Sequence, residues 1–255
     1  MDKVWTSAAN AVADIGSGSS LAVGGFGLCG VPVVLIDALL ATDATDLEIA
    51  SNNCGAEGFG LALLLGQGRI RRVVASYFGD NKEFARQYLA GEVEVEVTPQ
   101  GTLAERLRCA GSGIPAFYTP TGAGTVVADG GLTWQHHPDG SVAVASPAKE
   151  TRRFGDREYM LEEALPTDFG LVRAARGDRH GNLVFHASAR NFNPLCAMAA
   201  RVSIAEVVEL VEPGELDPDD IHLPGIFVDR VVALTPEQSR HKQIEKRVVR
   251  EREGV

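Results

Sequence analysis

Short apolar runs alternate with helical patterns along the first part of the chain. Leu21 to Val23, Leu47 to Ser51 and Val73 to Ser76 have the character of buried strands, and Pro32 to Leu40 and Phe59 to Leu65 predict helices between them. Such alternation is typical of parallel β-α-β units. We therefore predict an α/β fold with an open, mostly parallel sheet flanked by helices.

Further strands are predicted in the second half of the chain. The segments Asp168 to Ala174, Val202 to Val211 and Phe227 to Leu234 have strand character. Asn193 and Pro194 predict a helix start, with the asparagine as N-cap and the proline at the first helical position. On this interpretation Asn193 caps a helix and has no direct part in function.

A predicted strand in which polar and apolar residues alternate precedes the helix start near Gln100. Glu92 to Val97 places valines on one face and glutamates on the other, which predicts a half-solvated strand with glutamates at the surface. Thr102 and Glu105 have the spacing of a capping box. Gln100 is then expected in the turn between strand and helix, at the edge where open α/β sheets bind ligands.

A hairpin is predicted within the segment from about 134 to 148. Pro138-Asp139-Gly140 lies between His137 and an alternating run, which is a turn signal. Adjacent residues of a strand face opposite ways, so His136 and His137 are poor candidates for one metal site. We predict no metal site in the chain.

No internal repeat, low-complexity tract or linker divides the chain. Its 255 residues, 45% of them hydrophobic, are enough to bury one substantial core. We expect a single domain over residues 1–255, ending in a strongly charged tail from about 239 to 255.

Charge and composition limit the function classes. The formal net charge of −10 opposes general binding to nucleic acid or to anionic membranes. No apolar run reaches membrane-spanning length, and Met1 to Ile15 lacks the apolar core of a signal peptide, so we expect a cytoplasmic protein. The four cysteines have no C-x-x-C spacing, which favours reduced thiols.

A glycine-dense loop joins the first predicted strand to the first predicted helix. Its residues are Gly24, Gly25, Phe26, Gly27, Leu28, Cys29 and Gly30. Glycine adopts positive φ and has no Cβ, so a thioester carbonyl or a phosphate can come close to the backbone N–H groups. Pro32 fits the first turn of the following helix. The loop is our candidate ligand-binding segment, although a tight turn without a ligand has the same sequence. Cys29 within it has no nearby histidine to activate it, so we interpret it as a bystander.

The same loop also matches the G-x-G-x-x-G fingerprint of dinucleotide sites between Gly25 and Gly30. In that fingerprint the helix begins near the second glycine, so Pro32 would interrupt its hydrogen bonds. The second predicted strand is followed by the amides Asn52 and Asn53 instead of an acidic residue that would hold the ribose. Dinucleotide binding is therefore retained only as an alternative.

Three motifs in a fixed order carry a resemblance to a known family. They are Gly-Gly-Phe-x-x-x-Gly-x-Pro at 24–32, Ser-Asn-Asn-Cys-Gly at 51–55 and Thr-Pro-Gln-Gly-Thr-Leu-Ala-Glu-Arg at 98–106. Together they resemble the alpha subunit of family I coenzyme A transferases, most closely the succinyl-CoA:3-oxoacid (acetoacetate) type. Later blocks at 114–119, 121–125, 189–194 and 222–230 extend the resemblance over nearly the whole chain, while the segment 134–148 looks longer than the connection usual in the family.

The resemblance implies exchange of CoA between succinyl-CoA and a 3-oxoacid such as acetoacetate, with the CoA thioester as substrate and no tightly bound cofactor. The family's nucleophile is a glutamate in a Ser-Glu-Asn-Gly segment of the beta subunit, and this tetrapeptide does not occur here. Glu57, in Gly55-Ala56-Glu57-Gly58, is the nearest imitation, and we interpret it as a surface or structural residue. The resemblance therefore implies a separate beta subunit, in a hetero-oligomer expected to be α2β2.

The resemblance also implies roles for candidate residues. Gln100 matches an active-site glutamine of the family that can bond either the acyl group or the carboxyl of the nucleophile. The loop from Gly24 to Gly30 is expected to bind the CoA thioester region. Asn52 and Asn53 are candidate cleft residues, for which capping of a turn is an equal explanation.

Three classes of function stay open. The first is the alpha chain of the transferase, with a CoA-thioester hydrolase as its variant; the second is a dinucleotide-binding oxidoreductase domain; the third is a non-catalytic CoA-binding protein of the same fold.

Overall fold

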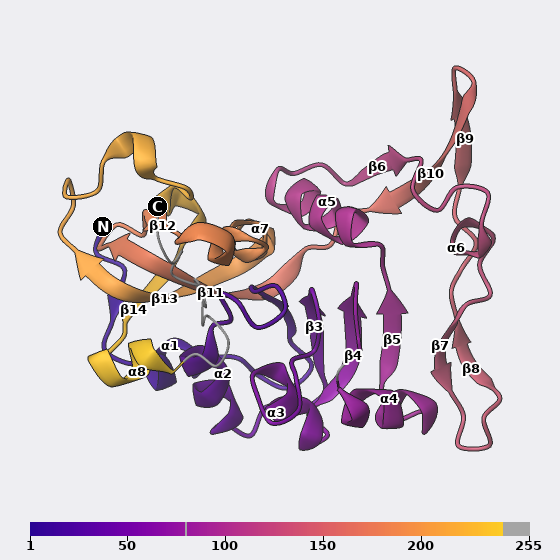
Figure 1. Ribbon diagram of the computed structural model, residues 1–255, viewed down its shortest axis with the longest axis horizontal. Coiled ribbons are helices and arrows are strands. Elements are labelled where there is room, and N and C mark those ends of the chain that lie inside the picture. The colour runs from indigo at the N-terminus through magenta and orange to yellow at the C-terminus, as the bar shows by residue number, and fades with distance from the viewer. Residues whose placement is uncertain (80, 242–255) are drawn as a thin grey trace, which may run out of the picture.

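A mostly parallel sheet forms the centre of the molecule (Figure 1). The computed structural model describes residues 1–79 and 81–241. In spatial order the strands are β1 (Val4–Trp5), β14 (Arg230–Ala233), β13 (Ala200–Val211), β11 (Thr167–Asp178), β2 (Ser20–Val23), β3 (Leu47–Ser51), β4 (Ile70–Ala75) and β5 (Glu94–Val97). All neighbours in this order are parallel, and β12 (Leu183–Val184) adds an antiparallel pair to β11. The predicted fold class is confirmed.

Helices cover both faces of the sheet (Figure 1). One face carries α1 (Ala8–Ala11), α2 (Val33–Leu40), α3 (Leu61–Gly66) and α4 (Lys82–Leu89), and the other carries α5 (Gln100–Gly111) and α7 (Asn193–Ala199). The second half of the chain also contains the helix α8 (Pro236–Arg240) and the 3-10 turns η1 (Ala187–Arg190), η2 (Pro218–Asp220) and η3 (Gly225–Phe227). None of the helices in the described ranges is long and apolar enough to cross a membrane.

The apolar strands supply two hydrophobic cores, one on each face. In β2, Leu21 and Val23 belong to the core beneath α2 and α3, while Ala22 belongs to the core beneath α5 and α7. The same division separates Ile49 from Ala50 in β3. Because side chains alternate across a strand, a strand that is buried on both faces must be apolar throughout. This requirement explains why these runs show no polar alternation.

An arm projects from the end of the sheet that carries β5 (Figure 1). It contains the antiparallel strands β6 (Ala116–Thr119), β10 (Arg157–Glu163) and β9 (Thr151–Phe154), the helix α6 (Val126–Asp129), and the hairpin of β7 (Thr133–His136) and β8 (Val142–Ala145). The predicted hairpin turn is confirmed, since Gly140 N donates to His137 O at 2.8 Å and His137 N donates to Ser141 O at 2.8 Å.

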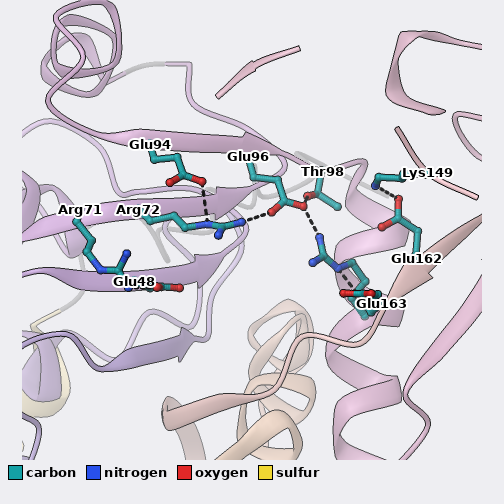
Figure 2. A network of polar contacts seen from close by, with 10 residues as sticks. Glu48, Arg71, Arg72, Glu94, Glu96, Thr98, Lys149, Glu162 and Glu163 are labelled. Carbon is teal, nitrogen blue, oxygen red and sulfur yellow. Dashed lines mark hydrogen bonds and ion pairs between the residues drawn. The ribbon is translucent and has the colours of Figure 1, made fainter. Parts of the chain in front are cut away.

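Glu96 contradicts the prediction that the glutamates of β5 lie at the surface. Its side chain is 7% exposed and lies between two guanidinium groups, Arg72 Nη2 at 2.6 Å and Arg106 Nη1 at 2.5 Å. Burial opposes ionisation of Glu96, but the two cations outweigh it and hold the pKa of the carboxyl below its usual value. Figure 2 shows Arg72 between Glu94 and Glu96, with the arm's Lys149–Glu162 pair nearby.

The start of α5 also differs from the prediction. The helix begins at Gln100 with Pro99 as N-cap, so Thr102 lies within the first turn and forms no capping box. Glu105 bonds Arg108 one turn further on, and Thr102 Oγ1 is buried with no hydrogen-bond partner among the described residues. Gln100 is therefore the first residue of the helix and not a turn residue.

The predicted charged tail begins inside the fold. Ser239 belongs to α8, and its carbonyl oxygen accepts a hydrogen bond from Arg173 Nη2 at 2.9 Å. Residues 242–255 of that prediction lie outside the described residues.

Candidate active site

The candidate residues follow the ends of four neighbouring strands. The glycine loop follows β2, Asn52 and Asn53 follow β3, Ser76 follows β4, and Gln100 comes shortly after β5. These strands are adjacent and parallel, so their carboxyl ends meet at one edge of the sheet. The sheet thus brings together residues that are as far apart in the chain as Gly24 and Gln100.

The glycine loop folds into a tight turn. Phe26 N donates to Cys29 O and Cys29 N donates to Phe26 O, both at 3.0 Å, which leaves Gly27 and Leu28 at the tip. Gly27 has φ of 57°, in the left-handed region that glycine enters without strain. Phe26 is 45% exposed beside this tip.

The glycines of the loop have two different roles. A Cβ at Gly24 would lie 2.0 Å from Asn193 Oδ1, one at Gly25 would lie 2.8 Å from Val31 Cγ2, and one at Gly30 would lie 2.8 Å from Ala189 O. These three positions are glycine because the surrounding protein is packed against them. A Cβ at Gly27 would meet no heavy atom of the described chain within 4 Å, so this position faces open space.

Asn193 is not the N-cap that the sequence predicted. It is the first residue of α7, fully buried, and Phe192 occupies the cap position. Its Oδ1 accepts from Arg173 N at 2.9 Å, and its Nδ2 donates to Gly30 O at 3.0 Å and to Ala189 O at 2.8 Å. Asn193 therefore ties the glycine loop to β11 and α7. Its role is structural support of the loop.

Asn52 is the centre of a cluster of amides at the edge of the sheet. It is 3% exposed, and its Oδ1 accepts from Gly27 N at 3.1 Å and from Asn53 Nδ2 at 3.1 Å. Its Nδ2 donates to Ser76 Oγ at 3.0 Å and contacts Gln100 Oε1 at 3.5 Å. Asn53 Nδ2 also donates to Gly27 O at 3.1 Å. The two asparagines thus hold the tip of the loop against the helix that carries Gln100.

A cavity of about 640 Å³ lies over this cluster. Of the predicted site residues, Phe26, Gly27, Leu28, Asn52, Asn53 and Gln100 line it, whereas Gly24, Gly25, Cys29 and Gly30 do not. Sequence reasoning missed Ser76 and Tyr77, which also line it. Ser76 could have been placed in the site from the sequence, because it ends a predicted strand of the same parallel sheet and must therefore reach the same edge as Asn52.

The lining of the cavity contains amides, hydroxyls and backbone groups and, within the described ranges, no carboxylate, imidazole or thiol. Glu57 lies exposed in the turn after Asn53 and is outside the lining, although Gly55 and Ala56 belong to it. Cys29 Sγ contacts Ser188 Oγ at 3.3 Å on another side of the loop. Such a cavity can bind and polarise a carbonyl group through hydrogen bonds.

A buried carboxylate occupies the N-terminus of the helix that follows the loop. Glu206, fully buried in β13, accepts from Leu35 N at 2.9 Å through Oε2 and from Arg173 Nη1 at 2.8 Å through Oε1. Burial raises the pKa of Glu206 to about 7, against the opposing effect of Arg173 and the helix N–H groups. Pro32 is the N-cap of this helix, one position before the predicted first turn, and offers no side-chain cap of its own.

This arrangement weakens the dinucleotide alternative. In a dinucleotide fingerprint the pyrophosphate binds the free N–H groups at the helix N-terminus. Here Glu206 takes that place from inside the protein. The place where a pyrophosphate would accept hydrogen bonds from the helix N-terminus is therefore occupied by the protein's own carboxylate.

Comparison with known proteins decides the family. The family model described as Coenzyme A transferase matches residues 5–234. The chain belongs to the coenzyme A transferase family. It is 63% identical over 251 residues to the A subunit of a probable succinyl-CoA:3-ketoacid coenzyme A transferase from Mycobacterium tuberculosis H37Rv, covering 98% of this chain and 100% of the relative.

Two longer proteins match the chain over about half of their own length. It is 49% identical over 254 residues to the human mitochondrial succinyl-CoA:3-ketoacid coenzyme A transferase 2, covering 99% of this chain and 48% of the human protein. The acyl-CoA transferase apoenzyme of Escherichia coli O157:H7 superposes with a TM-score of 0.77 at 22% identity, covering 93% of this chain and 48% of that chain. This transferase chain thus spans about half the length of both proteins, and the E. coli structure shows the shared fold.

Proposed function

We propose that this chain is the alpha subunit of a transferase that moves CoA from succinyl-CoA to a 3-oxoacid such as acetoacetate. The observation that carries the proposal is the lining of the cavity, which contains the amides of Asn52, Asn53 and Gln100 but, among the described residues, no carboxylate. In the proposed mechanism the nucleophilic glutamate comes from a partner chain. The M. tuberculosis relative, which the chain matches over its full length, is named as one subunit of its enzyme, and this supports the division.

The proposed reaction has two halves that mirror each other. A glutamate on the beta chain attacks the thioester carbonyl of succinyl-CoA, and the tetrahedral adduct expels CoA as a thiolate, which leaves an acyl-glutamyl anhydride. The thiolate then attacks the glutamyl carbonyl, which releases succinate and forms a glutamyl-CoA thioester. The 3-oxoacid carboxylate repeats both steps in reverse order and leaves as its CoA thioester.

The alpha chain would contribute binding and electrostatic stabilisation. Each attack places a negative charge on a carbonyl oxygen, and one preorganised donor lowers such a barrier by about 3 to 4 kcal/mol. The backbone at Gly27 is suited to approach by the thioester, because this residue has no Cβ and faces open space. The amide of Gln100 adds a side-chain donor to the lining.

The test is exchange by purified chains, first apart and then together. The alpha chain alone should exchange no CoA between succinyl-CoA and acetoacetate, and addition of the cognate beta chain should restore exchange with ping-pong kinetics. The complex is expected to be α2β2 by analytical ultracentrifugation. Robust exchange by the alpha chain, verified free of partner, would overturn the proposal and direct attention to Glu57.

Two other outcomes would assign a different function to the complex. Loss of the thioester at equal rates with and without acetoacetate would make it a hydrolase. Binding of succinyl-CoA with no turnover of any kind would make it a non-catalytic CoA-binding assembly.

A further inference from the structure

The side-chain amides of Asn52 and Gln100 meet in the lining of the cavity. Asn52 follows β3 and is almost fully buried, whereas Gln100 begins α5 and is exposed. Asn52 Nδ2 lies 3.5 Å from Gln100 Oε1, the outer limit of a hydrogen bond. The two ends of an amide differ in chemistry, since the nitrogen only donates and the oxygen only accepts. Which end of Gln100 faces the cavity therefore decides what it can recognise.

The orientation of Asn52 is set by a backbone group. Gly27 N–H can only donate, and it lies 3.1 Å from the Oδ1 end of Asn52. The other end must then be the NH2 group, directed at Ser76 and Gln100. Ser76 agrees with this assignment, because its hydroxyl proton is used on Asn52 O at 3.1 Å and its oxygen is left to accept from Asn52 Nδ2 at 3.0 Å.

The orientation of Gln100 follows from that of Asn52. One proton of Asn52 Nδ2 is used on Ser76 Oγ, and the other is available to Gln100. Because the neighbouring Asn52 group is a donor, Gln100 must present Oε1 to it. The Nε2 group of Gln100, for which no hydrogen bond is found within residues 1–79 and 81–241, is then turned away from Asn52.

We propose that Asn52 is a positioning residue that makes Gln100 a hydrogen-bond donor to ligands in the cavity. The backbone of the glycine loop orients Asn52, and Asn52 in turn orients Gln100. Gln100 would then donate to a carbonyl oxygen, a carboxylate or a developing oxyanion, and not bind a group that can only donate, such as an ammonium. This proposal rests on the proposed function only for the identity of the ligand.

Asn52→Asp is the selective variant for the test. It keeps an oxygen for Gly27 N–H but replaces the donor beside Gln100 by an acceptor, so Gln100 should rotate and donate Nε2 to the carboxylate. Ser76→Ala is the matched control, because it removes the other partner of Asn52 Nδ2 and leaves the contact with Gln100.

The first measurement is NMR of the full chain labelled with 15N in glutamine side-chain amides, with Gln100→Glu identifying the signal of Gln100. In the wild-type chain and in Ser76→Ala, the two Gln100 amide protons should exchange rapidly with solvent. In Asn52→Asp one of them should become protected. Protection in the wild-type chain, or the same exchange in wild type and Asn52→Asp, would overturn the proposal whether or not the complex exchanges CoA.

The second measurement is a double-mutant cycle on CoA exchange by the complex. Gln100→Ala should lower kcat/KM by about 100-fold. Asn52→Asp should lower it by at least about 30-fold in the wild-type background but by less than about threefold in the Gln100→Ala background, since its effect passes through Gln100. Equal effects in the two backgrounds would overturn the positioning role. Absence of exchange by the wild-type complex would instead refute the proposed function, and the NMR result would still decide the orientation of Gln100.

Discussion

Replacing Gly24 by alanine should unfold or severely destabilise the protein, although it adds a single methyl group. The added Cβ would lie 2.0 Å from Asn193 Oδ1 and 2.6 Å from Asn193 Cγ, far inside van der Waals contact. Rotation of the Asn193 side chain would not remove the problem fully, because the Cα of Asn193 is itself 3.2 Å from the new atom. The φ angle of Gly24 is not in the left-handed region, so the effect is steric and not conformational.

The magnitude follows from the hydrogen bonds that Asn193 would lose. Its side chain bonds Arg173 N, Gly30 O and Ala189 O, and it is fully buried. A buried polar group left without a partner costs about 1 to 3 kcal/mol. Displacement of Asn193 should therefore cost about 3 to 6 kcal/mol, a large part of the roughly 5 to 15 kcal/mol typical of a folded protein.

Urea unfolding of the full chain, followed by circular dichroism, would measure this cost. Gly101→Ala is a matched control, because its Cβ would meet no heavy atom of the described structure within 4 Å and the residue lies in α5. That variant should be no less stable than wild type. In an Asn193→Ala background, where the clashing amide is absent, the Gly24→Ala step should cost less than about 1 kcal/mol. A free energy of unfolding for Gly24→Ala within about 1 kcal/mol of wild type would refute the reasoning.

Three other variants test the site, the helix cap and the buried ion pair. Gly27→Ala should fold with a loss of about 1 kcal/mol from its positive φ, while exchange by the complex drops because the methyl group narrows the approach to the turn. The contribution of Glu206 to stability should fall by up to about 3 kcal/mol as pH rises from about 4.5 to about 7, since the native state holds the Glu206 proton more tightly than the unfolded chain. The difference in unfolding free energy between wild type and Glu206→Gln should therefore change over this range in urea unfolding. Arg106→Met should cost about 3 kcal/mol, because Glu96 keeps only Arg72 as a counter-ion and the Glu163 carbonyl loses the donor at 2.9 Å.

Each of these variants has an outcome that contradicts its prediction. Unchanged kcat/KM in Gly27→Ala would show that the turn is not part of the substrate-binding site. Identical pH slopes in wild type and Glu206→Gln would mean that Glu206 has the same pKa folded and unfolded. If Arg106→Met lowered the free energy of unfolding by less than about 1 kcal/mol, Arg72 alone would be enough to balance the charge of Glu96.

The sequence predicted the sheet and one wall of the cavity because those features depend on local patterns. The run from Leu47 to Ser51 is buried except at the half-buried Glu48, and the residues after it must reach the edge of the sheet. Asn52 and Gln100 could be placed together on this basis. Phe26 and Gly27 could be placed with them because the loop follows a neighbouring strand.

The errors concern residues whose partners come from distant elements. The alternation in β5 correctly separates Glu96 from Val95, but it cannot reveal that α5 covers the glutamate face and brings Arg106 to it. Asn193 has the local pattern of an N-cap, yet its partners are Gly30 and Arg173, from two other parts of the chain. Glu206 has no local signal at all, because the helix that it caps begins more than a hundred and fifty residues earlier.

The position of β11 in the sheet has a consequence for synthesis of the chain. β2 pairs with β3 on one side and with β11 on the other, and Leu21 lies opposite Phe169. While the ribosome is still making the segment before residue 167, β2 is an apolar edge strand with unsatisfied backbone groups. Open edges of this kind pair readily with other chains, so fragments that end before β11 should aggregate, and the nascent protein depends on prompt arrival of its second half.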